Sequence, residues 1–191
     1  VRKNPFIALL GRSGTYYLKN NQILFSMASS TTHELLHALS THYESEQNVY
    51  RTGFSIHPFF KALNEGYTEL FASRIEERPP HSYLNHVKFV RLVEALFDSK
   101  EAMMQAYFDN NLELLVQNMS EYMPTENAIQ LLLKEDAALR KQMIGTNTNM
   151  DYIPQRLALY QAVVTNCQDF DKLERFLEVA SEDKELQTAL R

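Results

Sequence analysis

Two histidines four residues apart, with a glutamate beside the first, constrain this chain more than any other feature: His33-Glu34-Leu35-Leu36-His37. On an α-helix, residues at this spacing lie on one face, so His33 and His37 point the same way. Two imidazoles placed like this can bind one Zn²⁺, with each nitrogen about 2.0–2.1 Å from the metal. The Glu34 carboxylate can take a proton from a water at that metal. The segment therefore predicts a helix that carries most of a hydrolytic metal site.

The third ligand has to come from another segment, because a catalytic zinc takes three protein ligands and keeps one position for water. A histidine later on the same helix, in the pattern HExxHxxGxxH, is excluded because Ser40 and Tyr43 occupy the required glycine and histidine positions. Glu65 and Glu69 form a second pair at helical spacing. We expect Glu65 to bind zinc and Glu69 to accept the ring N–H of zinc-bound His33.

Together the two motifs resemble those of the gluzincins, which include thermolysin-like and aminopeptidase-like zinc peptidases. The glutamate helix reads NExxSD in the thermolysin-like branch, and NEG is common in the aminopeptidase-like branch. The segment Asn64–Glu69 reads NEGYTE, which fits the first pattern with Thr for Ser and Glu for Asp, and the second through NEG. The similarity covers roughly residues 15–78 and does not extend to the C-terminal half.

The resemblance implies a zinc-dependent peptidase with a zincin-like core, acting on a peptide or protein substrate. By this resemblance, the zinc ligands are His33, His37 and Glu65, and the general base is Glu34. Glu69 and Asn64 would support the ligands from behind. A competing interpretation makes both glutamates solvated charges on a helix face, and both histidines ordinary core or surface residues.

The expected fold class is α+β, predominantly α, with a small N-terminal sheet. A zincin-like part, residues 1–78, carries both motifs and ends at Pro79-Pro80, because proline interrupts a helix. Residues 79–191 form a helical C-terminal part, and we expect the cleft between the two parts, with zinc at its floor. The alternative is one compact catalytic domain. The chain starts with Val1 rather than Met, as expected for a fragment of a longer protein.

Strand patterns precede the first motif helix. Tyr16–Leu18 and Gln22–Met27 are expected strands, joined by a turn at Lys19–Asn21. In a zincin layout the second would be an edge strand that receives an extended peptide; an ordinary core strand is the equally weighted alternative. We expect the motif helix over 31–43 and a polar loop covering the cleft over 44–58.

Helical periodicity dominates the rest of the chain. The glutamate helix is expected over 59–77, with Leu63, Leu70, Phe71 and Ile75 on its buried side. A break is expected at Asp98-Ser99. Further helices are expected over the following segments: 87–97, 103–108, 112–119, 125–141, 154–167 and 170–190.

Composition excludes several classes of protein. The hydrophobic fraction of 45% and charged fraction of 23% are ordinary for a globular chain. The net charge of −5 argues against a nucleic-acid partner. No apolar run approaches the roughly 20 residues of a transmembrane helix. Cys167 is the only cysteine, so no intrachain disulfide forms. A cytoplasmic and a secreted or cell-surface location both remain open.

Peptide hydrolysis also needs a donor for the developing oxyanion. Tyr83 and Tyr152 are the favoured candidates, from a wider set of tyrosines and histidines: Tyr67, Tyr83, Tyr122, Tyr152, His57, His81 and His86. An exopeptidase would need an acidic anchor for the substrate amine, for which Glu44 and Glu46 are candidates. The alternative function is an inactive or regulatory zincin-fold module that binds a protein partner. Intact Glu34 favours activity, since a structural zinc site has no use for a base there.

Overall fold

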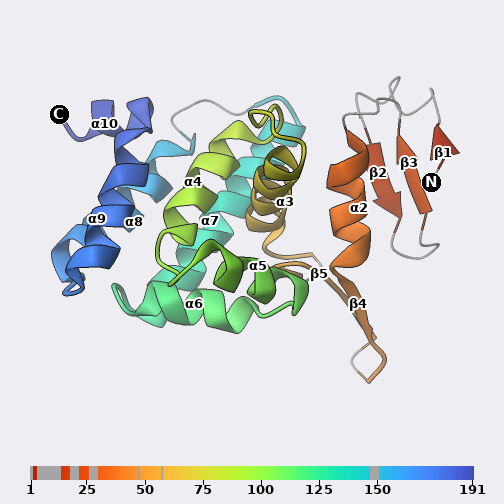
Figure 1. Ribbon diagram of the computed structural model, residues 1–191, viewed down its shortest axis with the longest axis horizontal. Helices are drawn as coiled ribbons and strands as arrows, with labels where there is room; N and C mark the ends of the chain where they lie inside the picture. Colours follow the sequence, from red (N-terminus) through yellow and green to blue (C-terminus); the bar gives the residue numbers. More distant parts are fainter. Residues whose placement is uncertain are drawn as a thin grey trace.

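A computed structural model of the chain describes residues 2–3, 14–17, 22–25, 30–46, 48–56, 58–146 and 151–191. Its fold is α+β and predominantly helical (Figure 1). The elements in chain order are β1 (Arg2–Lys3), β2 (Gly14–Tyr17), β3 (Gln22–Phe25), α2 (Thr31–Leu39), β4 (Thr41–Glu44), β5 (Val49–Thr52), β6 (Ser55–Ile56), α3 (Lys61–Ile75), α4 (Leu84–Glu94), α5 (Lys100–Phe108), α6 (Leu112–Ser120), α7 (Thr125–Met143), α8 (Ile153–Asn166), α9 (Phe170–Ser181) and α10 (Lys184–Ala189).

Two small sheets adjoin α2. The first has the strand order β1-β3-β2, with β3 parallel to β1 and antiparallel to β2. The second has the order β4-β5-β6 and is antiparallel throughout. Because β3 is central and its Ile23 is buried, the expectation of an edge strand at Gln22–Met27 is wrong, and the core-strand alternative holds within the described residues. The predicted turn at Lys19–Asn21 lies outside those residues.

Helix α2 stands between the first sheet and α3 (Figure 1). It ends at Leu39, so the expected continuation to Tyr43 is wrong. Thr41 Oγ1 donates to the carbonyl of His37 at 2.6 Å and lies 3.0 Å from Thr52 Oγ1 on β5. The chain then continues as β4, whose β-branched and aromatic residues favour a strand.

The segment after β4 differs from the expected loop. Its described residues form β5 and β6, which complete the second sheet, so the prediction of a polar loop covering the cleft is wrong. Tyr43 and Tyr50 face each other across the β4–β5 pair, with ring centroids 4.8 Å apart. Such cross-strand aromatic pairs stabilise a hairpin. The segment is short, so its hydrophobic periodicity is a weak signal for a strand.

Helix α3 receives its N-terminal cap from a distant part of the chain. Phe60, at its N-terminus, has a φ of 62° and provides no side-chain cap. The Asp136 carboxylate on α7 instead accepts from the backbone N–H groups of Phe60 and Ala62, at 2.5 and 2.8 Å. Unpaired N–H groups at a helix start need such acceptors. Asp136 therefore fixes where the glutamate helix begins.

One side of α3 belongs to the helical core. Leu63, Leu70 and Tyr67 are buried there, and Tyr67 packs against Phe54 and Tyr107. Phe71 is half-buried, whereas Ile75 is 53% exposed, so its predicted burial is wrong. Helix α3 packs against α4 and α7, which follow Pro79-Pro80 in sequence. The predicted division into two parts therefore runs through a packed set of helices.

The expected C-terminal helices are present, with shifted ends, and α4 and α5 are separated at Asp98-Ser99. The segment expected as one helix over 170–190 is two, α9 and α10. Asp183 separates them, because its side chain accepts from the N–H groups of Glu185 and Leu186 as a helix cap. In the described part of the chain, no helix has the length and apolarity needed to cross a bilayer.

Candidate metal centre

The two motif helices bring three donor atoms together. His33 Nε2 and His37 Nε2, both from α2, lie 3.1 Å apart. Glu65 Oε2 on α3 lies 3.1 Å from the first and 3.2 Å from the second. Among the described residues, this is the one set of three or more His, Cys, Asp or Glu side chains that could hold a metal ion. The i,i+4 spacing of the histidines produces the convergence, since both project from the same face of α2.

The triangle of donors is close in size to one face of a tetrahedron around zinc. Ligands at about 2.0–2.2 Å in tetrahedral geometry lie roughly 3.3–3.6 Å from one another. The observed edges of 3.1–3.2 Å are slightly shorter than that. The histidine side chains are 8% and 10% exposed, whereas Glu65 is 24% exposed. The donor set therefore fits Zn²⁺, with access from solvent on the side of Glu65.

Glu69 lies behind the first histidine. Its Oε2 is 3.3 Å from His33 Nδ1, the contact predicted from the sequence. With the proton on Nδ1, the ring donates to Glu69 and leaves the Nε2 lone pair for a metal. Glu69 is fully buried, so it is not the solvated surface charge of the competing interpretation.

Asn64 contacts the second histidine in a different way. Its Oδ1 accepts from the backbone N–H of Phe54 at 3.2 Å, and its Nδ2 lies 3.3 Å from His37 Nδ1. A neutral His37 that binds metal through Nε2 carries its proton on Nδ1, so the amide has to turn over and present its oxygen to the ring. The turn leaves the buried N–H of Phe54 without its acceptor, which costs about 1–3 kcal/mol. That is small beside the roughly 10–16 kcal/mol of a structural zinc site.

Glu34 is held against β2. A Cβ at Gly14 would lie 2.8 Å from Glu34 Cγ and Oε1, so a glycine is needed for this close approach. The Glu34 carboxylate also accepts from the backbone N–H of Tyr16. Burial raises the pKa of Glu34, while His37 and His33 oppose that rise. Sequence reasoning found Glu34 but not these two contacts with the strand.

The carboxylates and imidazoles of the centre shift one another's protonation. Burial alone would lower the pKa of His33, but hydrogen bonds with Glu65 and Glu69 raise it to about 9. Burial would raise the pKa of Glu65, but the two histidines hold it well below its usual range. Two acidic side chains facing two imidazoles form a site with a net affinity for positive charge.

The predicted oxyanion donors lie in different places. The Tyr83 ring stacks on that of His33, with centroids 5.8 Å apart and planes at 19°. Tyr152 is fully buried, with its ring against His86 and its hydroxyl donating to Gln142, so that hydroxyl is not directed at the centre. His81 is adjacent to Glu69, with Nδ1 3.0 Å from Oε1. The others do not adjoin the centre or are not described: Tyr67, Tyr122 and His86 are buried in the helical core, and His57 lies outside the described residues.

The candidate amine anchors are on the second sheet. Glu44 forms an ion pair with Arg51 on the neighbouring strand, at 2.6 Å. Glu46 is exposed in the turn that follows β4. Neither residue has a contact that assigns it to the metal centre.

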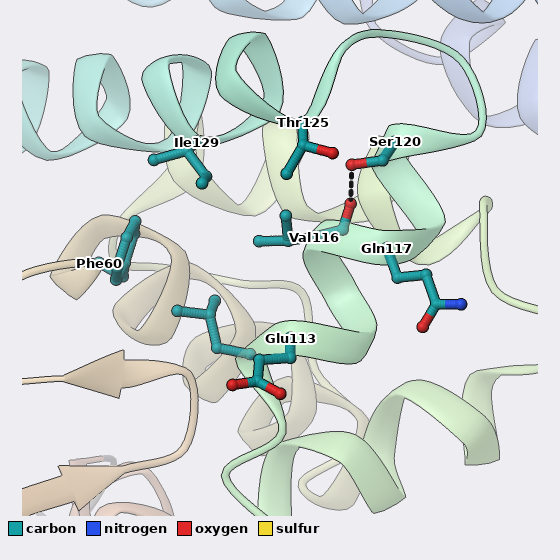
Figure 2. A pocket seen from close by; sticks show the side chains of 8 residues that line it. Phe60, Glu113, Val116, Gln117, Ser120, Thr125 and Ile129 are labelled. Carbon is teal, nitrogen blue, oxygen red and sulfur yellow. Dashed lines mark hydrogen bonds between the residues drawn. The ribbon is translucent and has the colours of Figure 1, made fainter.

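A pocket of about 520 Å³ lies between α6, α7 and the start of α3. Figure 2 shows Val116 and Ile129 facing it, with Phe60 at one side. Glu113 is the only ionisable side chain in its lining, so the pocket lacks the donor set that metal-assisted hydrolysis requires.

Comparisons with protein-family models, with curated proteins and with solved structures found no match to this chain.

Proposed function

We propose that the chain is a zinc-dependent metallopeptidase with a zincin-like catalytic core. The observation that supports this most directly is the convergence of His33 Nε2, His37 Nε2 and Glu65 Oε2 within 3.1–3.2 Å of one another. The sequence resemblance to gluzincins adds the assignment of Glu34 as general base. The geometry supports three ligands, and the motifs support the same three residues together with Glu34.

Zn²⁺ at this centre would supply a Lewis acid that makes water acidic enough to react near neutral pH. Glu34 accepts the proton of the attacking water, whose oxygen adds to the carbonyl carbon of the substrate. The C–N bond then breaks, and Glu34 returns the proton to the leaving amine nitrogen. Tyr83, which stacks on His33, is the proposed donor to the oxyanion.

The edge strand β2 is the proposed binding site for the extended substrate. It is one of the two outer strands of the first sheet among the described residues, and it is the one whose Gly14 and Tyr16 contact the side chain of Glu34. An extended peptide that pairs with a strand edge uses backbone hydrogen bonds, which are independent of its sequence. Substrate bound there would lie beside the general base.

The test combines metal analysis with a peptide-library cleavage assay, on the wild type and on Glu34→Gln. We expect about one Zn²⁺ per chain in both proteins, and a cleavage rate about 10²–10⁴-fold lower in the variant than in the wild type. The same cleavage rate in Glu34→Gln would contradict the proposal. Zinc binding without any cleavage would instead favour the alternative, a zinc-binding module for a protein partner.

A further inference from the structure

The Glu69 carboxylate accepts hydrogen bonds from other groups besides His33. Its Oε2 accepts from Ser82 Oγ at 2.8 Å, in addition to its contact with His33. Its Oε1 accepts from Arg78 Nη1 at 2.8 Å and from the backbone N–H of His81 at 3.0 Å. A carboxylate has about four lone-pair positions, so these donors fill its capacity. All of these donors except His33 come from the segment after α3, which also places His81 Nδ1 3.0 Å from Glu69 Oε1.

Burial makes these contacts energetically important. The side chain of Glu69 is only 1% exposed, and an isolated charge in such a place is strongly disfavoured. Arg78 provides the opposite charge and is itself held by Glu76 and by the carbonyl of Pro79. Loss of either Arg78 or Ser82 would remove one of the contacts that orient Glu69 toward His33.

The same segment covers one face of the first histidine. Pro79 and Pro80 restrict its backbone, since each proline fixes φ. Tyr83, at its end, has a φ of 52° and stacks on the His33 ring. One carboxylate therefore sets both the ring orientation of His33 and the position of the chain that lies against it.

We infer that Arg78 and Ser82 are positioning residues of the metal centre: through Glu69 they hold His33 in the orientation that binds Zn²⁺, and bound Zn²⁺ in turn stabilises the segment Arg78–Tyr83. The inference rests on the proposed metal centre. Coupling between two events is reciprocal, so the factor by which the segment raises zinc affinity is the factor by which zinc stabilises the segment.

The experiment measures Zn²⁺ affinity by competition with a chelator, in the full chain and in Arg78→Ala, Arg78→Lys and Ser82→Ala. Arg74→Ala is the matched control, because Arg74, in the last turn of α3, likewise pairs with a buried glutamate, Glu94, at 2.5 Å. Urea unfolding of each protein separates a loss of affinity from a loss of fold. Hydrogen exchange of the His81 amide, which donates to Glu69, reports on the segment with and without Zn²⁺.

We expect Arg78→Ala to weaken zinc binding about 10-fold or more, Ser82→Ala about 3–10-fold, and Arg74→Ala not at all. Zn²⁺ should slow exchange of the His81 amide in the wild type, and by less in Ser82→Ala. If Arg78→Ala does not fold, the zinc affinities of Arg78→Lys and Ser82→Ala provide the test. Wild-type zinc affinity in the folded Arg78 and Ser82 variants would overturn the inference alone, as would an equal loss in Arg74→Ala. A wild-type protein that binds no Zn²⁺ would overturn the metal centre and the inference with it.

Discussion

Two histidine–carboxylate clusters in this molecule differ in a way that separates the proposed metal centre from a structural pair. At the α2–α3 contact, two imidazole nitrogens and one carboxylate oxygen converge, and Glu65 keeps the cluster partly open to solvent. In the helical part, His86 on α4 and Glu135 on α7 are both 1% exposed and meet through a single contact of 2.8 Å.

The second cluster lacks what a metal needs. It offers one nitrogen and one oxygen, and among the described residues His86 Nε2 and Glu135 Oε1 have no hydrogen-bond partner. Burial raises the pKa of Glu135, and the nearby Arg156, which forms its own ion pairs with Asp183 and Glu185, only opposes that rise. The comparison indicates that the number of converging donors, together with access from solvent, distinguishes a metal site from a buried ion pair.

The largest effect is expected in the buried pair. His86→Ala removes the partner of a buried carboxylate, which typically destabilises a fold by about 3–5 kcal/mol. Urea unfolding measures this loss, and zinc competition should find the affinity of the folded variant unchanged. A variant with normal stability and weakened zinc binding would reverse the roles of the two clusters.

That variant also has a predicted pH dependence. Burial raises the pKa of Glu135, and His86 opposes the rise. Without His86, the folded state binds a proton at a higher pH than the unfolded state, so protonation favours folding as the pH falls through the folded pKa. The stability deficit of His86→Ala relative to wild type should therefore narrow between neutral and mildly acidic pH, and a deficit that widens would contradict this account.

Loss of a direct ligand comes next. Glu65→Ala should weaken zinc binding by more than about 100-fold, beyond the range for residues that support a ligand from behind. Glu135→Gln is the matched control, since it changes a buried glutamate in the other cluster without removing a metal ligand. Equal affinity losses in the two variants would contradict the distinction.

Glu69 should matter less than Glu65. Glu69→Ala removes the acceptor of the His33 ring proton and should weaken zinc binding by about 10–100-fold without abolishing it. The measurement is the same chelator competition. Wild-type affinity in Glu69→Ala would mean that its contact with His33 has no role in metal binding.

The smallest effect concerns Asn64. An aspartate there has two acceptor oxygens, so it can accept from the Phe54 N–H and from His37 Nδ1–H together, without the turn that the amide requires. Asn64→Asp should therefore bind Zn²⁺ as tightly as wild type or up to about tenfold more tightly. Weaker binding in Asn64→Asp, with Asn64→Ala unchanged, would contradict the proposed orientation of His37.

Local patterns in the sequence predict the features that depend on local geometry. The i,i+4 spacing brings His33 and His37 to one face, and helical periodicity locates α3 to α8 within a few residues at most ends. The expected contact between His33 and Glu69 is present for the same reason, because Glu69 lies one turn past Glu65.

Features set by distant contacts could not be read in this way. The cap that Asp136 gives to α3 joins residues on different helices, and no spacing rule links them. The contacts of Arg78 and Ser82 with Glu69 depend on how the chain turns back after Pro79-Pro80. The β4–β5 hairpin did have a local signal, since Thr41 and Tyr43 are β-prone, but the helical pattern of the preceding residues dominated the prediction.

The most direct test of the metal centre is an equilibrium Zn²⁺ titration of the wild type beside the His33→Ala/His37→Ala double variant. Two of the three converging donors are lost in that variant, whereas the His86–Glu135 pair is untouched. The wild type should bind about one Zn²⁺ per chain tightly, and the folded double variant should bind it no better than an unstructured peptide. Equal affinity for Zn²⁺ in the two proteins would contradict the account.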